Sequence, residues 1–177
     1  MQIILSGDIG SGKGAISKML ADLLSYPRVS TGDLFRKMAK ERDISLMELL
    51  QLADKDRNIH KELDDKVLVI LNESPKIILD ARLGAYLAPK AFKIYLKVNE
   101  ILGARRIVDR EGYNSVVQAV EQNRKRQEIA RQTFKEMYNF DFQDLDNYNA
   151  IIDTSYKQEG DVMKAILDNL AYYKLGL

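Results

Sequence analysis

The chain has 177 residues, of which 27 are basic and 26 acidic, so its formal net charge is +1. This length suits one domain with a substantial core, and the balanced charge favours neither nucleic acid nor an anionic membrane as a partner. The absence of cysteine excludes disulfides and thiolate metal sites, and the single histidine excludes histidine clusters. No apolar run reaches membrane-spanning length and no signal peptide precedes the first strand, so we expect a cytoplasmic protein. We also expect a monomer.

The first motif is a glycine-rich loop between an apolar run and an amphipathic stretch. Residues 7–14 read Gly-Asp-Ile-Gly-Ser-Gly-Lys-Gly; they follow Ile3-Ile4-Leu5 and precede a face of Ile16, Met19, Leu20, Leu23 and Leu24. Glycines let successive backbone N–H groups turn into one concavity, and a helix N-terminus adds free N–H groups and partial positive charge. With Lys13 as a mobile ammonium, this strand, loop and helix predict a polyphosphate site.

The loop departs from the usual pattern at two places. A Ser or Thr whose hydroxyl ligates magnesium usually follows the lysine, but Gly14 and Ala15 stand here and the next hydroxyl is Ser17. Asp8 adds a negative charge where a phosphate would be repelled. Two interpretations follow: phosphates, waters and a carboxylate elsewhere hold the metal, or nucleotide binding is weakened.

Five short apolar runs alternate with helical patterns, at 2–6, 27–30, 76–80, 92–98 and 150–153. Their composition suits parallel strands buried on both faces and joined by right-handed crossovers. A helical region occupies about 31–73, and a closing helix spans about 159–174. We therefore expect an α/β fold with a doubly wound five-stranded parallel sheet and ligands at the carboxyl ends of the strands.

A second motif, Ser-Thr-Gly-Asp-Leu-Phe-Arg at 30–36, follows the second strand. Thr31 and Asp33 are residue types that cap helices, which is one interpretation. Arg36 lies just over one turn into the helix, near the sheet edge, where it can bind a second phosphate. After a phosphate loop at this distance, the functional interpretation is the better one.

The third motif, Ile-Ile-Leu-Asp-Ala-Arg at 77–82, ends an apolar strand with an acid. In phosphate-loop enzymes such a carboxylate holds magnesium or its waters, so Asp80 can compensate for the missing hydroxyl. The alternative is an ordinary helix cap or strand-end turn. Arg82 is a further candidate contact to phosphate or base.

Six of the 11 arginines fall between residues 105 and 131. Arginine is favoured where planar, bidentate contact to phosphate is needed. Arg106 and Arg110 are spaced i, i+4 and should share a helix face. In the next helix Arg124 and Arg131 lie on one flank of the apolar stripe and Arg126 on the other, so not all three reach one phosphate. We expect a segment that closes over the nucleotide.

Aromatic and histidine residues outside these motifs are given structural roles. We expect His60 at the surface. Tyr172 and Tyr173 are expected to pack, and so are Phe134 and Tyr138, which have core spacing.

In these motifs the chain resembles the nucleoside monophosphate kinases of the adenylate/cytidylate kinase superfamily, above all the short cytidylate kinases typical of archaea and some bacteria. The resemblance covers nearly the whole chain and rests on the blocks at 7–14, 30–36, 80–86, 106–110 and 151–155. It implies a P-loop NTPase-type fold in a single kinase domain of residues 1–177. Within it, a helical insertion at about 31–73 would bind the acceptor and an arginine-rich helical lid would span about 105–135.

The resemblance also implies roles for individual residues. The implied ATP site consists of the loop and the arginine pair before the lid, which are Gly7, Asp8, Ile9, Gly10, Ser11, Gly12, Lys13, Gly14, Ala15, Arg106 and Arg110. The implied acceptor site is Thr31, Gly32, Arg36, Arg82, Arg124 and Arg126. Catalysis would depend on Lys13, Arg110, Arg126, Arg131 and Asp80, with Asp80 meeting the metal through water.

The implied reaction is in-line transfer of the γ-phosphoryl group of ATP, with Mg²⁺, to CMP or dCMP to give the diphosphate. The alternatives are a nucleotide-binding module with weakened catalysis, which Ala15 and Asp8 would explain, and a monophosphate kinase with another acceptor base, AMP or UMP. A kinase for an unrelated small acceptor is a further alternative, against which the 30–36 motif argues.

Overall fold

The computed structural model describes residues 1–176 and contains one parallel sheet with the strand order β2-β3-β1-β4-β5. The strands are β1 (Gln2–Gly7), β2 (Arg28–Ser30), β3 (Ile77–Asp80), β4 (Phe92–Lys97) and β5 (Ala150–Asp153). β1 pairs with β3 on one side and β4 on the other. Its carboxyl end therefore opens at the point where the strand order reverses, which is where doubly wound sheets bind ligands. The predicted fold class is confirmed.

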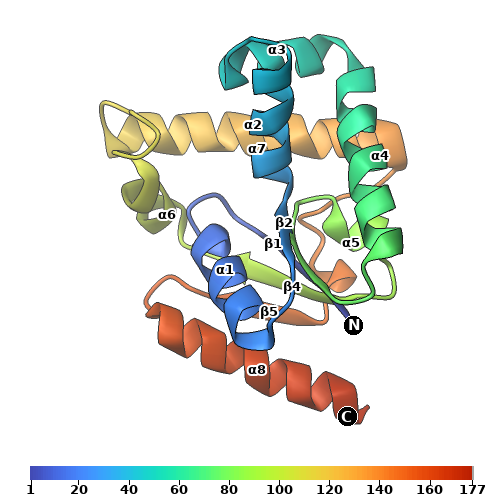
Figure 1. The fold of residues 1–177 in the computed structure, drawn as a ribbon. Coiled ribbons are helices and arrows are strands. Elements are labelled where there is room, and N and C mark those ends of the chain that lie inside the picture. Colours follow the sequence, from blue (N-terminus) through green and yellow to red (C-terminus); the bar gives the residue numbers. More distant parts are fainter. Residues whose placement is uncertain (177) are drawn as a thin grey trace.

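Helices cover both faces of this sheet (Figure 1). α1 (Lys13–Leu24) and α8 (Glu159–Leu175) pack on one face, where Leu20 and Ile166 meet Leu5. α4 (Arg57–Glu73) and α5 (Gly84–Leu87) cover the other face, where Val67 packs near Ile4. Successive strand residues point to opposite faces, so a continuous apolar run such as Ile3-Ile4-Leu5 supplies both layers of core.

The predicted helical region at 31–73 consists of α2 (Thr31–Glu41), α3 (Leu46–Lys55) and α4. We call these three helices the helical insertion. Ser45 and Glu48 form a capping box that begins α3, and Asp56 caps α4. The insertion has a core of its own, formed by Phe35, Met38, Ala39, Leu49, Ala53 and Leu63.

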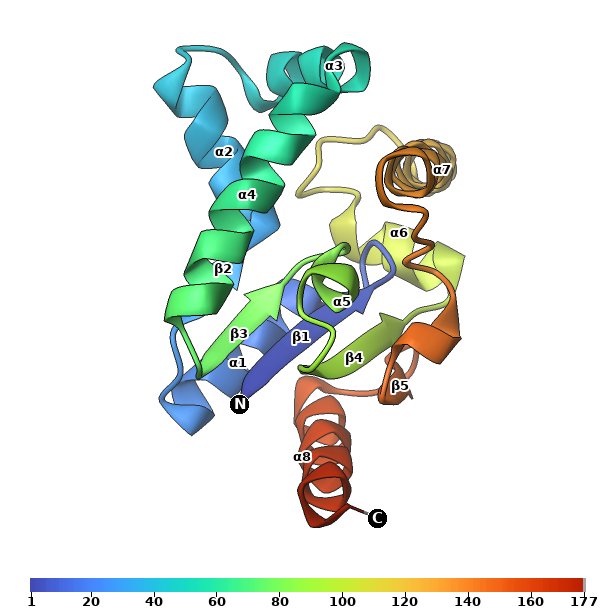
Figure 2. The same cartoon turned by 90° about the vertical axis from the view of Figure 1, so that its right-hand side faces the viewer.

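The segment predicted to close over the nucleotide contains α6 (Glu100–Ile107) and α7 (Val116–Tyr138), and a 3₁₀ turn, η1 (Leu145–Asn147), follows. Because α6 ends at Ile107, Arg110 lies in the turn beyond it, and the prediction that Arg106 and Arg110 share a helix face is wrong. Figure 2 shows the helical insertion on one side of the carboxyl edge of the sheet and α6 and α7 on the other. The two groups of helices thus flank the end of β1.

Several burial predictions need correction. β5 is an edge strand, so Ile151 is 46% exposed and the strand is not buried on both faces. In α1 the buried side is Ile16, Ser17, Leu20 and Ala21, whereas Met19 and Leu23 are exposed. Tyr172 is exposed rather than packed, although the ring of Tyr173 packs at a tilt against that of Phe92, at a centroid distance of 4.8 Å.

His60 is half-buried rather than at the surface, because its ring stacks on Phe35 of α2 at a centroid distance of 6.1 Å. Phe134 packs edge-on to Phe142 and Tyr138 packs near Tyr86, as expected of structural aromatics. Across residues 1–176, none of the helices has the length and apolar character needed to span a membrane.

Candidate active site

The glycine-rich loop joins β1 to α1 and leaves the start of α1 open. Gly7, Gly10 and Gly12 have φ of 140°, 81° and 85°, in the region that favours glycine. A Cβ on Gly7 would lie 2.2 Å from the carbonyl oxygen of Leu96, so the loop also presses against β4. The N-cap is Gly12 and no side chain caps α1, so its first N–H groups remain free for an anion.

Lys13 bends back over this loop. Its Nζ donates hydrogen bonds of 2.7 Å to the carbonyl oxygens of Gly7 and Asp8. Burial lowers the pKa of Lys13 to about 8, against the opposing effect of nearby Asp80. The ammonium of Lys13 is therefore removed from water, and a bound anion would stabilise its charge.

The carboxylate of Asp8 is bound by donors from three other parts of the fold. Its carboxylate accepts hydrogen bonds from the Tyr95 hydroxyl at 2.8 Å, the Val98 N–H at 3.0 Å and the Gln127 side chain at 3.3 Å. These donors come from β4, the loop after it and α7. Asp8 therefore ties the phosphate loop to its neighbours, and the expected repulsion of a phosphate is offset by three donors.

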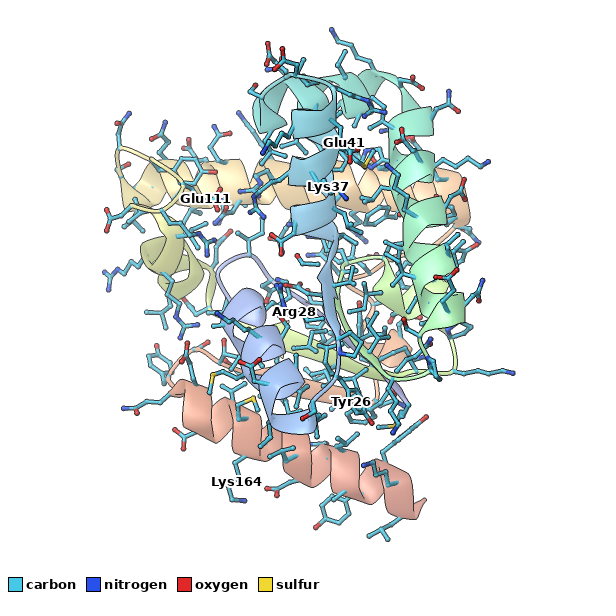
Figure 3. The ribbon with its side chains drawn as sticks, viewed as in Figure 1. Tyr26, Arg28, Lys37, Glu41, Glu111 and Lys164 are labelled. Carbon is cyan, nitrogen blue, oxygen red and sulfur yellow. The ribbon has the colours of Figure 1, made fainter. Side chains whose placement is uncertain are left out.

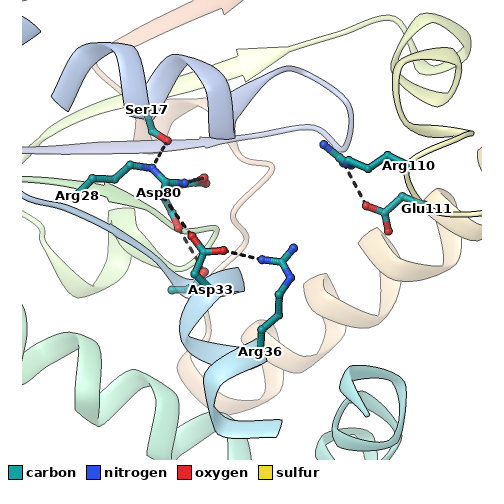
Figure 4. Close-up of polar contacts among 8 residues, drawn as sticks. Ser17, Arg28, Asp33, Arg36, Asp80, Arg110 and Glu111 are labelled. Atoms are coloured by element: carbon teal, nitrogen blue, oxygen red, sulfur yellow. Dashed lines mark hydrogen bonds and ion pairs between the residues drawn. The ribbon is translucent and has the colours of Figure 1, made fainter. Parts of the chain in front are cut away.

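Asp80, at the end of β3, belongs to a polar network centred on Arg28 (Figure 4). Arg28 donates to the Ser17 hydroxyl at 2.7 Å, to Asp33 at 3.2 Å and to Asp80 at 3.4 Å. Figure 3 places Arg28 beside α1, at the foot of α2. Burial raises the pKa of Asp80, while Lys13 and Arg28 act to lower it. Asp80 is therefore a positioned strand-end carboxylate rather than a helix cap.

The same network bears on the capping interpretation of the 30–36 motif and on the hydroxyl of Ser17. The N-cap of α2 is Ser30, which makes no capping hydrogen bond, and neither Thr31 nor Asp33 caps the helix. Asp33 instead binds Arg28 and Arg36, and the Thr31 hydroxyl donates to the Asp80 carbonyl oxygen at 3.3 Å. Ser17 is buried and held by Arg28, so its hydroxyl is not free to replace the one missing after Lys13.

Arg82 lies two residues beyond Asp80 and is the second cation near the loop. Its guanidinium lies 5.8 Å from the ring centre of Phe142, within cation–π range. Burial lowers the pKa of Arg82 to about 10, and the positive charge of Arg126 lowers it further. Within residues 1–176, no carboxylate lies within ion-pair distance of either Lys13 or Arg82.

The other predicted arginines, apart from Arg106, are each held by a carboxylate. Arg36 pairs with Asp33 at 2.6 Å, Arg110 with Glu111 at 3.1 Å and Arg126 with Glu111 at 3.3 Å. Arg124 pairs with Glu100 and Arg131 with Asp141. The three arginines of α7 thus bind three different acids. Of these three, Arg126 is the one whose charge acts on both Lys13 and Arg82.

Arg106 and the loop after β5 form a cavity beside the phosphate loop. Arg106 donates to the carbonyl oxygens of Gly10 and Thr154, at 3.3 and 2.6 Å. Thr154 is buried and its hydroxyl donates to the Ser11 carbonyl oxygen. The cavity has a volume of about 560 Å³, and its lining includes Ser11, Gly12, Arg106, Thr154, Gln158 and Gly160.

The residues present suit a metal ion that is bound mainly by nucleotide phosphates and water. Among residues 1–176, no three Asp, Glu or His side chains converge on one point. Asp80 lies close to Lys13 and Arg28, and Arg28 also binds Asp33. Mg²⁺ commonly keeps several waters and binds one or two carboxylates together with phosphates, and this donor set fits that mode.

Reasoning from the sequence missed Arg28, Tyr95 and Gln127. Arg28 opens a short strand, Tyr95 lies inside an apolar run and Gln127 is one of several polar residues on α7. None belongs to a motif, and each meets its partner across more than ten residues of sequence. A tertiary structure was required to find them.

Comparison with known proteins agrees with this geometry. The model of the Cytidylate kinase-like family matches residues 2–156. A cytidylate kinase of Methanococcoides burtonii is 39% identical over 156 residues, with 88% of each chain covered. One from Haloarcula marismortui is 34% identical and covers 97% of this chain and 99% of its own, and one from Sulfolobus acidocaldarius is 34% identical with 94% and 92% covered.

Solved structures agree on the fold. A shikimate kinase of Aquifex aeolicus has a TM-score of 0.63 at 18% identity, with all of both chains covered. An uncharacterized protein of Eubacterium ventriosum reaches 0.72 at 16% identity, covering 95% and 96%. At these identities the likeness concerns the α/β kinase fold alone. The sequence relatives and the match over residues 2–156 go further: the chain belongs to the cytidylate kinase-like family.

Proposed function

We propose that this protein transfers the γ-phosphoryl group of ATP to CMP or dCMP, giving the nucleoside diphosphate and ADP. The observation that carries the proposal is the pair Lys13 and Arg82, two desolvated cations without an ion-pair partner among residues 1–176, beside the free N–H groups of α1. The names of the family and its archaeal relatives support the acceptor. Asp8 does not favour a weakened binding module, since three donors bind its carboxylate.

In this proposal the loop from Gly7 to Ala15 holds the phosphates of ATP, and the cavity beside Arg106 takes its base. Arg36 and Arg82, with Thr31 and Gly32, bind the acceptor. The helical insertion and the segment with α6 and α7 close over both nucleotides, and closure excludes water that would otherwise hydrolyse ATP. Arg110 and, among the arginines of α7, Arg126, whose charge acts on both Lys13 and Arg82, then exchange their shared partner Glu111 for phosphates.

The chemistry asked of the protein is positioning and charge stabilisation, because phosphoryl transfer needs little covalent help. Lys13 and the arginines neutralise charge on the transferring group and keep the two phosphates in line. Mg²⁺, bound to the phosphates and met through water by Asp80, would supply further neutralisation.

The test is an ADP-release assay with ATP and Mg²⁺ against CMP, dCMP, UMP, AMP and GMP. We expect acceptor-dependent ADP production to be fastest with CMP or dCMP. A tenfold preference for AMP or GMP, which corresponds to about 1.4 kcal/mol of discrimination, would contradict the acceptor while leaving the reaction class intact.

A further inference from the structure

Asp8 contributes to the phosphate loop with both its main chain and its side chain. Its carbonyl oxygen accepts hydrogen bonds from Lys13 Nζ at 2.7 Å and from the Ser11 hydroxyl at 2.8 Å. Its carboxylate accepts from the Tyr95 hydroxyl at 2.8 Å and from the Val98 N–H at 3.0 Å. Tyr95 lies in β4 and is 3% exposed, so the sheet holds the side chain of Asp8. The carboxylate therefore has a fixed position beside Lys13.

The helix α7 also binds this carboxylate. Gln127 Nε2 donates to Asp8 Oδ1 at 3.3 Å, across 119 residues of sequence. Gln127 follows the buried Asn123 by four residues, and side chains with this spacing share a helix face. The inward face of α7 is thus joined to the phosphate loop at Gln127.

Arg126, the residue before Gln127, is the arginine of α7 that acts on the phosphate position. Its guanidinium donates to Glu111 at 3.3 Å. Its positive charge also lowers the pKa values of Lys13 and Arg82. Any contact that fixes α7 at Gln127 therefore fixes the backbone from which Arg126 extends.

The carboxyl end of α7 is held by the helical insertion. The Tyr138 hydroxyl donates to the buried Asp64 of α4 at 2.6 Å, and the buried Thr133 hydroxyl accepts a 2.9 Å hydrogen bond from Arg57. These contacts lie about two turns or more from Arg126 along the helix. They orient α7, but they leave the height of Arg126 above the phosphate loop to a nearer contact.

We propose that Gln127 is a positioning residue, which holds Arg126 in place relative to Lys13 through its hydrogen bond to the Asp8 carboxylate. This inference rests on the proposed function, in which Arg126 binds phosphate. A shift of α7 by one residue would move Arg126 by about 1.5 Å, and a misplacement of about 1 Å can cost on the order of 10²-fold in rate. The acidic residue of the loop then supports phosphoryl transfer by positioning a cation.

The test compares two variants of Gln127 at neutral pH, with ATP and the preferred nucleoside monophosphate. Gln127→Ala removes the donor, whereas Gln127→Glu keeps the volume and replaces the donor with a carboxylate that Asp8 repels. We expect kcat to fall about tenfold or more in Gln127→Ala and at least as far in Gln127→Glu, with both KM values within about twofold of wild type. A packing role predicts the reverse order, because Glu preserves the volume. Wild-type kcat in either folded variant, or a smaller loss in Gln127→Glu than in Gln127→Ala, would overturn the inference.

A double variant shows whether Gln127 acts through Arg126. Arg126→Gln alone should lower kcat, and adding Gln127→Ala to it should change kcat by less than about twofold, because the contact then has no cation to position. Losses that multiply, or wild-type kcat in Arg126→Gln, would overturn the inference.

The matched control is Gln132→Ala, which changes an exposed glutamine of α7 whose side chain donates to Glu128 of the same helix. Its kcat should equal that of wild type, and a loss as large as that of Gln127→Ala would overturn the inference. A thermal melt of each variant checks that it folds. If the wild-type protein phosphorylates no nucleoside monophosphate, the proposed function fails and this inference fails with it. If it uses CMP and the Gln127 variants keep its kcat, only this inference fails.

Discussion

The cations at the carboxyl edge of the sheet, beneath the proposed nucleotide positions, differ from those on the flanking helices. Lys13 and Arg82, at the carboxyl edge of the sheet, are desolvated, have lowered pKa values and meet no carboxylate at ion-pair distance within residues 1–176. Arg36 and Arg124, on α2 and α7, are 61% and 67% exposed and each is paired with an acid. The first group is fixed in place by the sheet, whereas the second can change partners.

This difference separates two ways of binding a phosphate. A desolvated cation without a carboxylate partner is strongly stabilised by a bound anion, because the low polarity of its surroundings strengthens the attraction between the two charges. An exposed ion pair is worth little, so a flexible arginine can leave its acid for a phosphate at small cost. We therefore expect large effects from changes at Lys13 and Arg82 and smaller ones at the flanking arginines.

The largest effect should come from Lys13→Ala. Turnover should fall by about 10²-fold or more, the scale for losing one preorganised charged donor. Stability should be unchanged or higher at pH 7, since the variant removes an ammonium that burial disfavours. The measurements are kcat and a thermal melt. Near-normal turnover in a folded variant would remove Lys13 from the mechanism.

Arg82→Met should weaken acceptor binding by at least tenfold. Arg82 has no carboxylate at ion-pair distance within residues 1–176, so its whole charge is available to the acceptor phosphate and is lost in the variant. Its matched control is Arg124→Gln, which breaks an exposed pair with Glu100 and should change the acceptor KM by less than about threefold. Equal losses in the two variants would erase the distinction between fixed and flanking arginines.

The pH dependence follows from the lowered pKa of Lys13. The ammonium of the free protein deprotonates above about pH 8, so kcat/KM for ATP should fall about tenfold per pH unit beyond that point. Bound phosphates raise this pKa again, so kcat should stay level to higher pH. In Lys13→Ala, kcat/KM for ATP should not fall at alkaline pH. A fall of kcat/KM that begins only near the ordinary lysine pKa would show that Lys13 is not desolvated in solution.

Arg36 and Arg110 should separate the two nucleotides. Figure 4 shows Arg36 on the side of the Asp80 network and Arg110 apart from it, beyond α6. We expect Arg36→Ala to raise the acceptor KM and Arg110→Ala to raise the ATP KM, each by about fivefold to tenfold. Titration of both variants with both nucleotides checks this; two variants that lose the same nucleotide would refute the division.

The smallest effect concerns the metal. Asp80→Asn should raise the Mg²⁺ concentration for half-maximal rate about twofold to tenfold, because an amide accepts hydrogen bonds from metal-bound water less well than a carboxylate. The rate is measured at saturating ATP and acceptor. An unchanged Mg²⁺ titration would mean that Asp80 serves only to hold Arg28.

The sequence by itself determined the sheet and the phosphate loop. Apolar runs marked all five strands to within about one residue, and the glycine spacing around Lys13 identified the loop, because both depend on neighbouring residues along the chain. Helix geometry also placed Arg126 on the opposite flank of α7 from Arg124 and Arg131, but the separate acids that these three arginines bind come from the tertiary structure.

Only the tertiary structure decided which polar groups meet. From the sequence, the charge of Asp8 was expected to repel phosphate. In the structure Tyr95 and Gln127, from distant segments, donate hydrogen bonds to its carboxylate. The pairs Arg28–Asp80 and Asp64–Tyr138 bridge 52 and 74 residues of sequence. No local spacing encodes such contacts, because they arise where separate elements pack, and it is burial at those places that shifts the pKa values of Lys13, Arg82 and Asp64.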